Sequence, residues 1–186
     1  MSNLVIFLGP PGAGKGTQAG KIAKEKNLAH ISTGDMLREH VSNATELGKT
    51  AKILLEEGKL VPDSLVIEML QERLLSKDCV NGAILDGFPR TIAQAESLDS
   101  VSAEFKISKV IVFEADRDEL IKRILNRGET SGRSDDTEES VSVRLEVYEN
   151  DTSPLIEYYE LKNLVAKINA VGEVENIYKL ILKEFE

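Results

Sequence analysis

A glycine-rich turn that carries one lysine follows the first apolar segment of the chain. Residues 4–8 read Leu-Val-Ile-Phe-Leu, and residues 9–17 read Gly-Pro-Pro-Gly-Ala-Gly-Lys-Gly-Thr. Glycines let such a turn adopt positive φ angles, so that successive backbone N–H groups converge on a phosphate. Lys15 can then reach the β and γ phosphates of a nucleoside triphosphate. The apolar spacing after Gly14 predicts a helix whose positive N-terminal end points at the same anion, so the segment predicts a nucleotide-binding loop.

The residue after the lysine departs from the usual form of this loop. That form has Ser or Thr there to hold Mg²⁺, whereas this chain has Gly16, with Thr17 one position later. The departure argues against a direct protein ligand for Mg²⁺ and favours a metal shell filled mostly by water.

Strand-like and helical patterns alternate along the rest of the chain. Short apolar runs occur at residues 4–8, 29–31, 83–85, 109–113 and 164–168, with longer helical patterns between them. This alternation predicts a parallel sheet covered by helices. Residues 32–61 and the charged stretch 127–136 interrupt it, and the second is typical of a solvated, turn-rich loop. The C-terminal pattern predicts one helix face in the core, formed by Val174, Ile177, Tyr178, Ile181 and Phe185.

Composition and charge limit the class of protein. The chain has 186 residues, of which 41% are hydrophobic and 30% charged, as in an ordinary single globular domain. Its formal net charge of −9 argues against nucleic acid or an anionic membrane as the main partner, because both need a basic face. No signal-peptide, membrane-span or lipidation pattern is present. These features predict a cytoplasmic protein without a membrane anchor.

The cysteine and histidine residues predict no metal or disulfide chemistry. Cys79 is the single cysteine, and His30 and His40 lie apart in sequence from any cysteine or cluster of carboxylates. A disulfide within the chain and a zinc site of the usual kind are therefore excluded. We expect all three residues to be structural.

Two further motifs follow predicted strands. Ser32-Thr33-Gly34-Asp35 closes the second apolar run, where Ser32 or Asp35 can cap the next helix. Asp86 follows residues 83–85, at the C-terminal end of a predicted central strand, where α/β sheets place ligand sites. A simple Asp-Gly turn is the competing interpretation of Asp86-Gly87.

Taken together, four motifs resemble those of the adenylate kinases, within the nucleoside monophosphate kinases. They are the loop at 9–16, Ser-Thr-Gly-Asp-Met-Leu-Arg at 32–38, Asp-Gly-Phe-Pro-Arg at 86–90 and Arg-Gly-Glu-Thr-Ser-Gly-Arg-Ser-Asp-Asp at 127–136. The resemblance implies an α/β P-loop NTPase-type fold in three layers, a five-stranded parallel sheet with helices on both faces. It also implies a core of residues 1–31, 62–125 and 137–186, a monophosphate-binding excursion at 32–61, and a short lid at 126–136 without zinc ligands.

The resemblance also assigns roles to individual residues. It implies that Arg127 lies against the adenine ring of ATP, with the backbone of Gly172 facing the same ring, and that Asp86 orients Mg²⁺ through water. The implied ligands of the ATP phosphates are Pro10, Pro11, Gly12, Ala13, Gly14, Lys15, Gly16 and Thr17. The implied AMP-binding set is Thr33, Arg38, Lys59, Leu60, Val61, Gly87, Phe88, Pro89, Arg90, Gln94, Arg133 and Arg144. The implied catalytic set is Lys15, Arg90, Arg127, Arg133 and Arg144.

The implied reaction is ATP + AMP ⇌ 2 ADP, carried out by a monomer in adenine nucleotide homeostasis and AMP salvage. Phosphoryl transfer depends on positioning and charge stabilisation, so it needs cations. ATP and AMP together carry about six negative charges, and the matched cationic positions are also six: Lys15, Arg38, Arg90, Arg127, Arg133 and Arg144. Arginine suits this role because its planar fork holds two phosphate oxygens and stays charged.

Two residues bear on which monophosphate is accepted. The amide of Gln94 both donates and accepts, which matches the adenine edge with its amino group beside a ring nitrogen. In the family, pyrimidine-preferring relatives tend to carry asparagine there and alanine at the position of Thr33. Both residues favour AMP over a UMP/CMP kinase on the same scaffold. Two less favoured functions would also use such a loop: a non-catalytic nucleotide-binding module, and a kinase that phosphorylates a hydroxyl group of a carboxylic acid.

Overall fold

We describe the protein from a computed structural model, in which residues 2–101, 105–131, 133 and 135–185 are described. Gly132 and Ser134 of the predicted lid lie outside this part. The strands are β1 (Ser2–Leu8), β2 (Ala29–Ser32), β3 (Gly82–Asp86), β4 (Phe105–Glu114) and β5 (Val165–Asn169). The α-helices are α1 (Lys15–Lys26), α2 (Thr33–Ser42), α3 (Glu46–Glu56), α4 (Asp63–Leu74), α5 (Ile92–Val101), α6 (Arg117–Ser131), α7 (Glu138–Val147), α8 (Pro154–Glu160) and α9 (Val174–Lys183). A 3₁₀ turn, η1 (Lys77–Cys79), and a π-helical segment, η2 (Tyr148–Thr152), complete the described elements.

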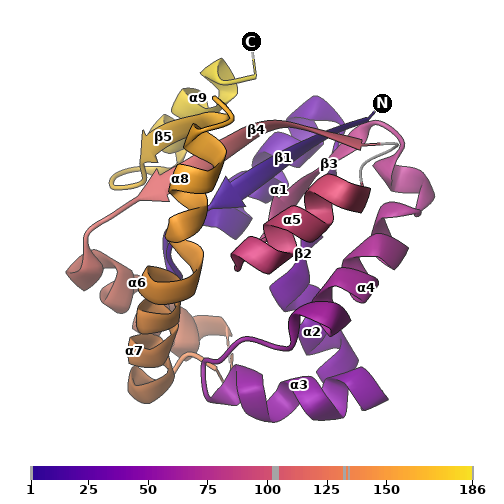
Figure 1. Ribbon diagram of the computed structural model, residues 1–186. Helices are drawn as coiled ribbons and strands as arrows, with labels where there is room; N and C mark the ends of the chain where they lie inside the picture. Colours follow the sequence, from indigo (N-terminus) through magenta and orange to yellow (C-terminus); the bar gives the residue numbers. More distant parts are fainter. Residues whose placement is uncertain (1, 102–104, 132, 134, 186) are drawn as a thin grey trace.

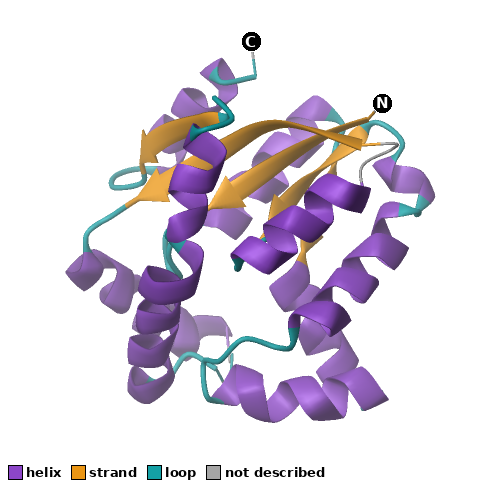
Figure 2. Ribbon diagram, viewed as in Figure 1, coloured by secondary structure: helices purple, strands orange, loops and turns teal. Residues whose placement is uncertain are grey.

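The strands form one five-stranded parallel sheet in the order β2-β3-β1-β4-β5. Its two faces are covered by different helices (Figures 1 and 2). Successive side chains of a strand point to opposite faces. Accordingly Leu4 and Ile6 of β1 pack with α4, α5 and α8, while Val5 and Phe7 pack with α1, α6 and α9. The predicted α/β three-layer fold is confirmed.

Most of the helices and strands that the sequence predicted are present, but some begin or end at other residues than predicted. β4 begins at Phe105 rather than 109, because the polar residues Lys106 and Ser108 alternate with buried Phe105 and Ile107 and hide the apolar run. The helix face predicted at the C-terminus is confirmed for Ile177 and Ile181, which are buried.

The same prediction was wrong for Val174. Its side chain is 47% exposed, because this residue opens α9, one turn before the residues that pack on the sheet.

The prediction of a turn-rich loop at 127–136 was wrong for its first half. Helix α6 continues to Ser131, and the hydroxyl of Thr130 donates within the helix to the carbonyls of Asn126 and Arg127. The chain after α6 packs against the helix at Gly128, where a Cβ would lie only 2.8 Å from the backbone oxygen of Asp136. A glycine at this position therefore permits the packing. The close approach therefore explains a glycine that the sequence alone suggested as a loop residue.

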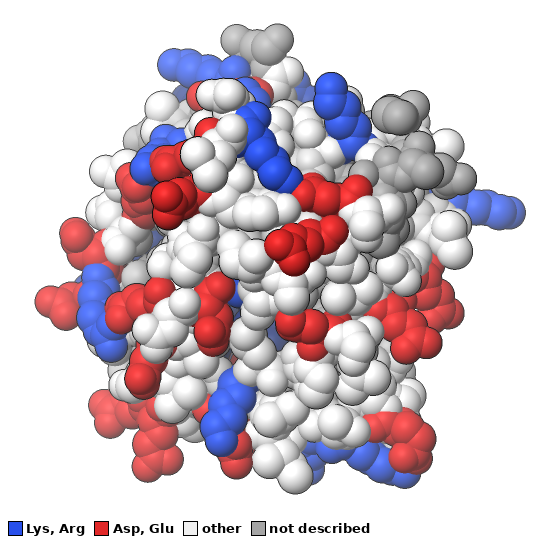
Figure 3. Space-filling model, viewed as in Figure 1, with Lys and Arg blue, Asp and Glu red and all other residues white. Residues whose placement is uncertain are grey.

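Acidic and basic side chains are interspersed on the face shown in Figure 3, without a continuous basic area. Among the described residues, no helix has the length and apolar character needed to cross a membrane.

Candidate functional site

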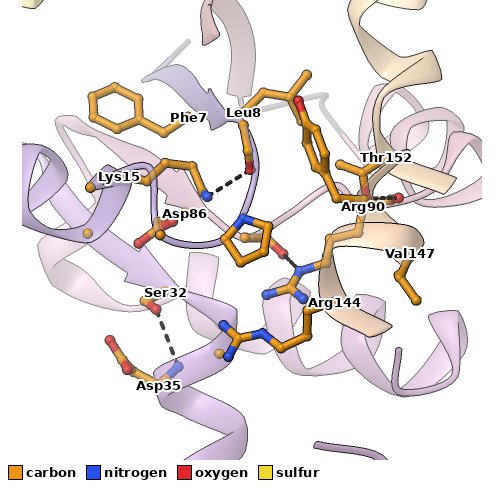
Figure 4. Close-up of a pocket in the computed structure, with 18 of the residues that line it drawn as sticks. Phe7, Leu8, Lys15, Ser32, Asp35, Asp86, Arg90, Arg144, Val147 and Thr152 are labelled. Carbon is orange, nitrogen blue, oxygen red and sulfur yellow. Dashed lines mark hydrogen bonds between the residues drawn. The ribbon is translucent and has the colours of Figure 1, made fainter. Parts of the chain in front are cut away.

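A cavity of about 460 Å³ lies beyond the carboxyl ends of β1, β2 and β3. It is lined by the glycine-rich loop, the end of β3, the start of α2, the Gly58–Leu60 region and side chains from α6 and α7. Figure 4 shows Lys15 and Asp86 on one side of it and Arg90 and Arg144 on another. Its volume is within the range typical of small-molecule sites. The cavity therefore unites all four motifs that the sequence singled out.

The loop between β1 and α1 has the backbone that a phosphate-binding turn requires. Gly12 and Gly14 have φ angles of 82° and 85°, and a Cβ at Gly12 would lie 2.8 Å from the carbonyl oxygen of Leu120. Lys15 Nζ donates to the carbonyl oxygens of Gly9 and Pro10, at 2.8 Å each. The ammonium is thereby held across the mouth of the loop, where α1 begins.

The electrostatics of the cavity act strongly on Lys15. Burial lowers the pKa of Lys15 to about 8, although Asp86 opposes the change, and the nearby Arg90 and Arg144 lower it further. A cation at this position is costly without an anion beside it, so the site is built to receive negative charge.

Asp86 ends β3 and lies beside the loop. Its Oδ2 would be 3.2 Å from a Cβ at Gly16, so the glycine makes room for this carboxylate. Among the described residues, no group of three or more His, Cys, Asp or Glu side chains could hold a metal ion. A lone carboxylate of this kind suits contact with Mg²⁺ through water better than a complete protein ligand shell.

His30, which in the sequence lies apart from any cluster of carboxylates, has one carboxylate beside it in the fold. Parallel pairing of β2 with β3 brings its Nε2 to 3.6 Å from Asp86 Oδ2, and the ring lines the cavity. Sequence spacing could not show this, because 56 positions separate the two residues. His40, in contrast, contacts Thr45 through Nδ1, and Cys79 is buried beside Arg73, in keeping with structural roles.

Five arginines line the cavity, and carboxylates hold most of them. Arg127 donates two hydrogen bonds to Asp136, at 2.7 and 2.6 Å, and Arg144 donates to the same carboxylate at 2.7 Å. Burial opposes ionisation of Asp136, but the bonds from these two arginines prevail and lower its pKa. The lining arginines are Arg38, Arg90, Arg127, Arg133 and Arg144.

A second group of ion pairs joins the two interrupting segments. Asp35 Oδ1 is 2.5 Å from Arg38 and 3.2 Å from Arg133, so it links helix α2 to the segment after α6. Arg38 and Arg144 each lie 3.6 Å from Asp135. In the sequence, Asp135 and Asp136 were part of the motif at 127–136, but no site role was predicted for either residue.

Arg90 is held differently, by backbone. Its Nε donates to the carbonyl oxygen of Gly87 at 2.9 Å, and the hydroxyl of Thr152 donates to the Arg90 carbonyl. Burial and the neighbouring Arg144 lower the pKa of Arg90 to about 10, so it stays cationic at neutral pH. Thr152 belongs to η2, where Ser153 N–H bonds the carbonyl of Tyr148 just before Pro154. Such π segments recur at functional sites, but the sequence offered only the proline as a signal.

A smaller pocket of about 50 Å³ adjoins the cavity. Its lining includes Lys59, Leu60 and Val61, with Gln94 facing them from α5. Thr33 belongs to the same lining, and its hydroxyl donates to the Gly87 carbonyl. Most of the predicted monophosphate residues are thus brought together, whereas Phe88, Pro89 and Arg133 do not line this pocket.

Four predicted site residues do not line either cavity. Pro10 contributes its carbonyl to Lys15, while Ala13 and Phe88 are buried in the core, with Phe88 preceding a cis peptide bond to Pro89. Gly172 lies exposed in the loop between β5 and α9. Just after it, the carbonyl oxygen of Val174 accepts a hydrogen bond from the side chain of Gln18 in α1. Their contacts with nucleotide stay predictions.

Comparison with known proteins gives a consistent result. The family model described as "Adenylate kinase" matches residues 7–164. A protein of Thermus thermophilus named adenylate kinase is 46% identical over 179 residues, which cover 95% of this chain and 94% of the relative. Proteins with the same name from Leptospira biflexa and Bacteroides thetaiotaomicron are 46% and 47% identical, over 96% of this chain and 97% and 95% of their own lengths.

Proposed function

Because the chain belongs to the adenylate kinase family, we propose that its cavity transfers the terminal phosphoryl group of Mg²⁺-bound ATP to AMP and releases two ADP. The observation that carries this assignment is the convergence of six cationic side chains on one cavity in a chain of net charge −9. Because the net charge is negative, the protein surface as a whole does not attract anions. The cations are therefore concentrated where two nucleotides must be brought together.

The residues divide between the two nucleotides. Lys15 and the amides of the loop bind the β and γ phosphates of ATP, and the positive end of α1 adds to their field. Arg38 and Arg90 hold the phosphate of AMP, while Arg133 and Arg144 stabilise the charge of the phosphoryl group in transfer. The acceptor is already an anion, so the reaction needs no general base.

Arg127 stacks on the adenine of ATP in this proposal. Asp136 holds the edge of its guanidinium through two hydrogen bonds, which leaves the planar faces for an aromatic ring. The raised pKa of Arg127, caused first by its bonds to Asp136, keeps the guanidinium charged.

Mg²⁺, when bound with ATP, neutralises charge on the phosphate oxygens. Asp86 would hold its water ligands, because the carboxylate lies beside Gly16 and no hydroxyl directly follows Lys15. We propose no zinc.

We further propose that residues 32–61 and 126–136 move as an excursion and a lid around the core of residues 1–31, 62–125 and 137–186. The pocket beside Gln94, at about 50 Å³, is smaller than ligand sites usually are, which supports a movement of residues 59–61 when a purine binds. The Asp35–Arg133 contact joins the proposed lid directly to the excursion. Closure over bound nucleotides would exclude water, which otherwise competes as acceptor.

AMP is the proposed acceptor, in preference to CMP or UMP. Gln94 supplies a donor and an acceptor within the monophosphate pocket, and Thr33 occupies the position where pyrimidine-preferring relatives usually have alanine. We also propose a cytoplasmic monomer without nucleic-acid or membrane partners; the acidic net charge supports the absence of those two kinds of partner.

Two substitutions test the site. Lys15→Met and Arg90→Ala should each lower kcat by more than about 100-fold while the fold is retained, because one cation in a phosphoryl-transfer site is worth several kcal/mol. Arg117→Ala is the matched control, since Arg117 is exposed and pairs with Glu149 outside the cavity. Steady-state kinetics with circular dichroism as the folding check would measure this. An unchanged kcat in either cavity variant would contradict the proposed site.

A further inference from the structure

The amide of Gln94 is held at both ends inside the protein. Gln94 is 2% exposed, and its Oε1 accepts a hydrogen bond of 2.7 Å from the backbone N–H of Arg90. Its Nε2 donates to Asp63 Oδ1, also at 2.7 Å. The other oxygen of Asp63 accepts from the hydroxyl of Thr91 at 3.0 Å, so the carboxylate is itself fixed.

These two neighbours allow only one orientation of the amide. A carboxylate accepts hydrogen bonds and does not donate, whereas a backbone N–H donates and does not accept. The NH₂ group must therefore face Asp63, and the carbonyl oxygen must face Arg90. A flipped amide would set its oxygen against the carboxylate and its N–H against the backbone N–H, which would leave buried polar groups without hydrogen bonds.

The fixed amide keeps one donor and one acceptor for a ligand. Nε2 retains its second N–H, and Oε1 retains its second lone pair. The six-membered ring edge of a 6-aminopurine presents an amino donor beside a ring-nitrogen acceptor, which complements this pair. A 6-oxopurine presents an oxygen acceptor beside a ring N–H, which is the reverse pattern.

Asp63 occupies the position from which it can enforce this pattern. It is the first residue of α4 and directly follows Pro62. The three residues before Pro62, at 59–61, line the monophosphate pocket. A carboxylate is favoured at this helix start, because the helix N-terminus is positive. Its contacts to Thr91 and Gln94 join the end of the excursion to the start of α5.

We propose that Asp63 is a specificity-determining positioning residue, which locks the Gln94 amide so that the site accepts a 6-aminopurine monophosphate and rejects a 6-oxopurine monophosphate. The proposal rests on the proposed function, because it assumes that Gln94 reads the acceptor base. Asp63 does not contact the base itself. It acts through the orientation of Gln94.

The test compares AMP with IMP as acceptors, at saturating Mg²⁺-ATP. In Asp63→Ala the ratio of kcat/KM for AMP to that for IMP should fall at least tenfold, mainly through a higher KM for AMP, while KM for ATP changes less than twofold. Asp63→Asn retains an accepting oxygen of the same reach and should restore most of the ratio. In Asp63→Ser, the serine is well suited to a helix start, but its side chain is too short to reach Nε2 of Gln94. This variant should therefore behave as Asp63→Ala does. It replaces Asp63→Ala in the test if Asp63→Ala does not fold.

Two controls separate the possible failures. Asp118→Ala removes a first-turn carboxylate from α6, outside both cavities, and should leave the AMP-to-IMP ratio unchanged. Gln94→Ala should lose the ratio as Asp63→Ala does; a retained ratio in Gln94→Ala would overturn the assignment of Gln94 and with it this part of the proposed function. Loss of the ratio in Gln94→Ala, together with a wild-type ratio in folded Asp63→Ala and Asp63→Ser, would overturn the role of Asp63 alone.

Discussion

The arginines of the cavity meet carboxylates of two kinds, and the difference decides which contacts phosphates can replace. The side chain of Asp136 is fully buried between Arg127 and Arg144, whereas that of Asp35 is 57% exposed beside Arg38 and Arg133. Removing one partner from a buried pair costs about 3–5 kcal/mol, but an exposed pair contributes only about 0–1 kcal/mol. We therefore expect Asp136 to keep its arginines oriented when nucleotides bind, and Asp35 to release Arg38 and Arg133 to phosphate.

Lys15 gives a prediction at the same scale. Its pKa of about 8 means that the ammonium of the free protein loses its proton as pH rises through 8, and the phosphates then lose a cation. We expect kcat/KM for ATP to fall on the alkaline side with an apparent pKa near 8, since this parameter reports groups of the free enzyme. Lys15→Arg, which stays charged, should show no such limb at that pH. A profile of the wild-type protein that is flat to pH 10 would contradict the assigned role.

At the scale of elements, the strand ends place the chemistry. The loop follows β1, Ser32 ends β2 and Asp86 ends β3, and the register pairs Phe7 and Ser32 with Asp86. Because parallel strands end at one edge of a sheet, apolar runs followed by polar motifs were enough to predict this part of the site. Thr152 and Asp63 could not be found in that way, since their places in the site depend on hydrogen bonds between residues far apart in the sequence.

The excursion depends on a close crossing of two helices. Gly48 of α3 is buried against α2, and a Cβ there would lie 2.0 Å from the carbonyl oxygen of His40. Gly48→Ala should lower the free energy of unfolding by about 3 kcal/mol, the upper end of the usual overpacking cost. Gly20→Ala is the matched control, because a Cβ at this position in α1 meets no atom within 4 Å. It should instead stabilise the protein by about 0.4–1 kcal/mol.

Denaturant titrations would measure both glycine variants. Equal effects of the two substitutions would contradict the packing that we describe between α2 and α3.

For the whole molecule, the sequence predicted the layers and the approximate cavity but not how the cavity's charges are balanced. Hydrophobic alternation is a local property, so the sheet and most helices could be predicted from it. The ion pairs depend on how far α6 continues along the chain. That length depends on the close approach of Asp136 to Gly128, which is a contact of the folded chain and cannot be read from the sequence. His30 beside Asp86 is likewise a consequence of strand order.

A net charge of −9 also bears on how substrates are recognised. The overall field repels nucleotides, which are anions, and the local cluster of cations must overcome that repulsion at short range. The proposed closure of residues 32–61 and 126–136 serves this purpose, because cations act more strongly where water is excluded.

The most direct test of the account is ADP formation by the purified protein with Mg²⁺-ATP and, in turn, AMP, CMP, UMP, GMP or no acceptor. We predict rapid turnover with AMP and little with the other four conditions, since Gln94 and its neighbours present a surface for adenine. Preferential turnover with CMP or UMP would contradict the assignment of Gln94 and Thr33, and no turnover with any acceptor would contradict the proposed reaction.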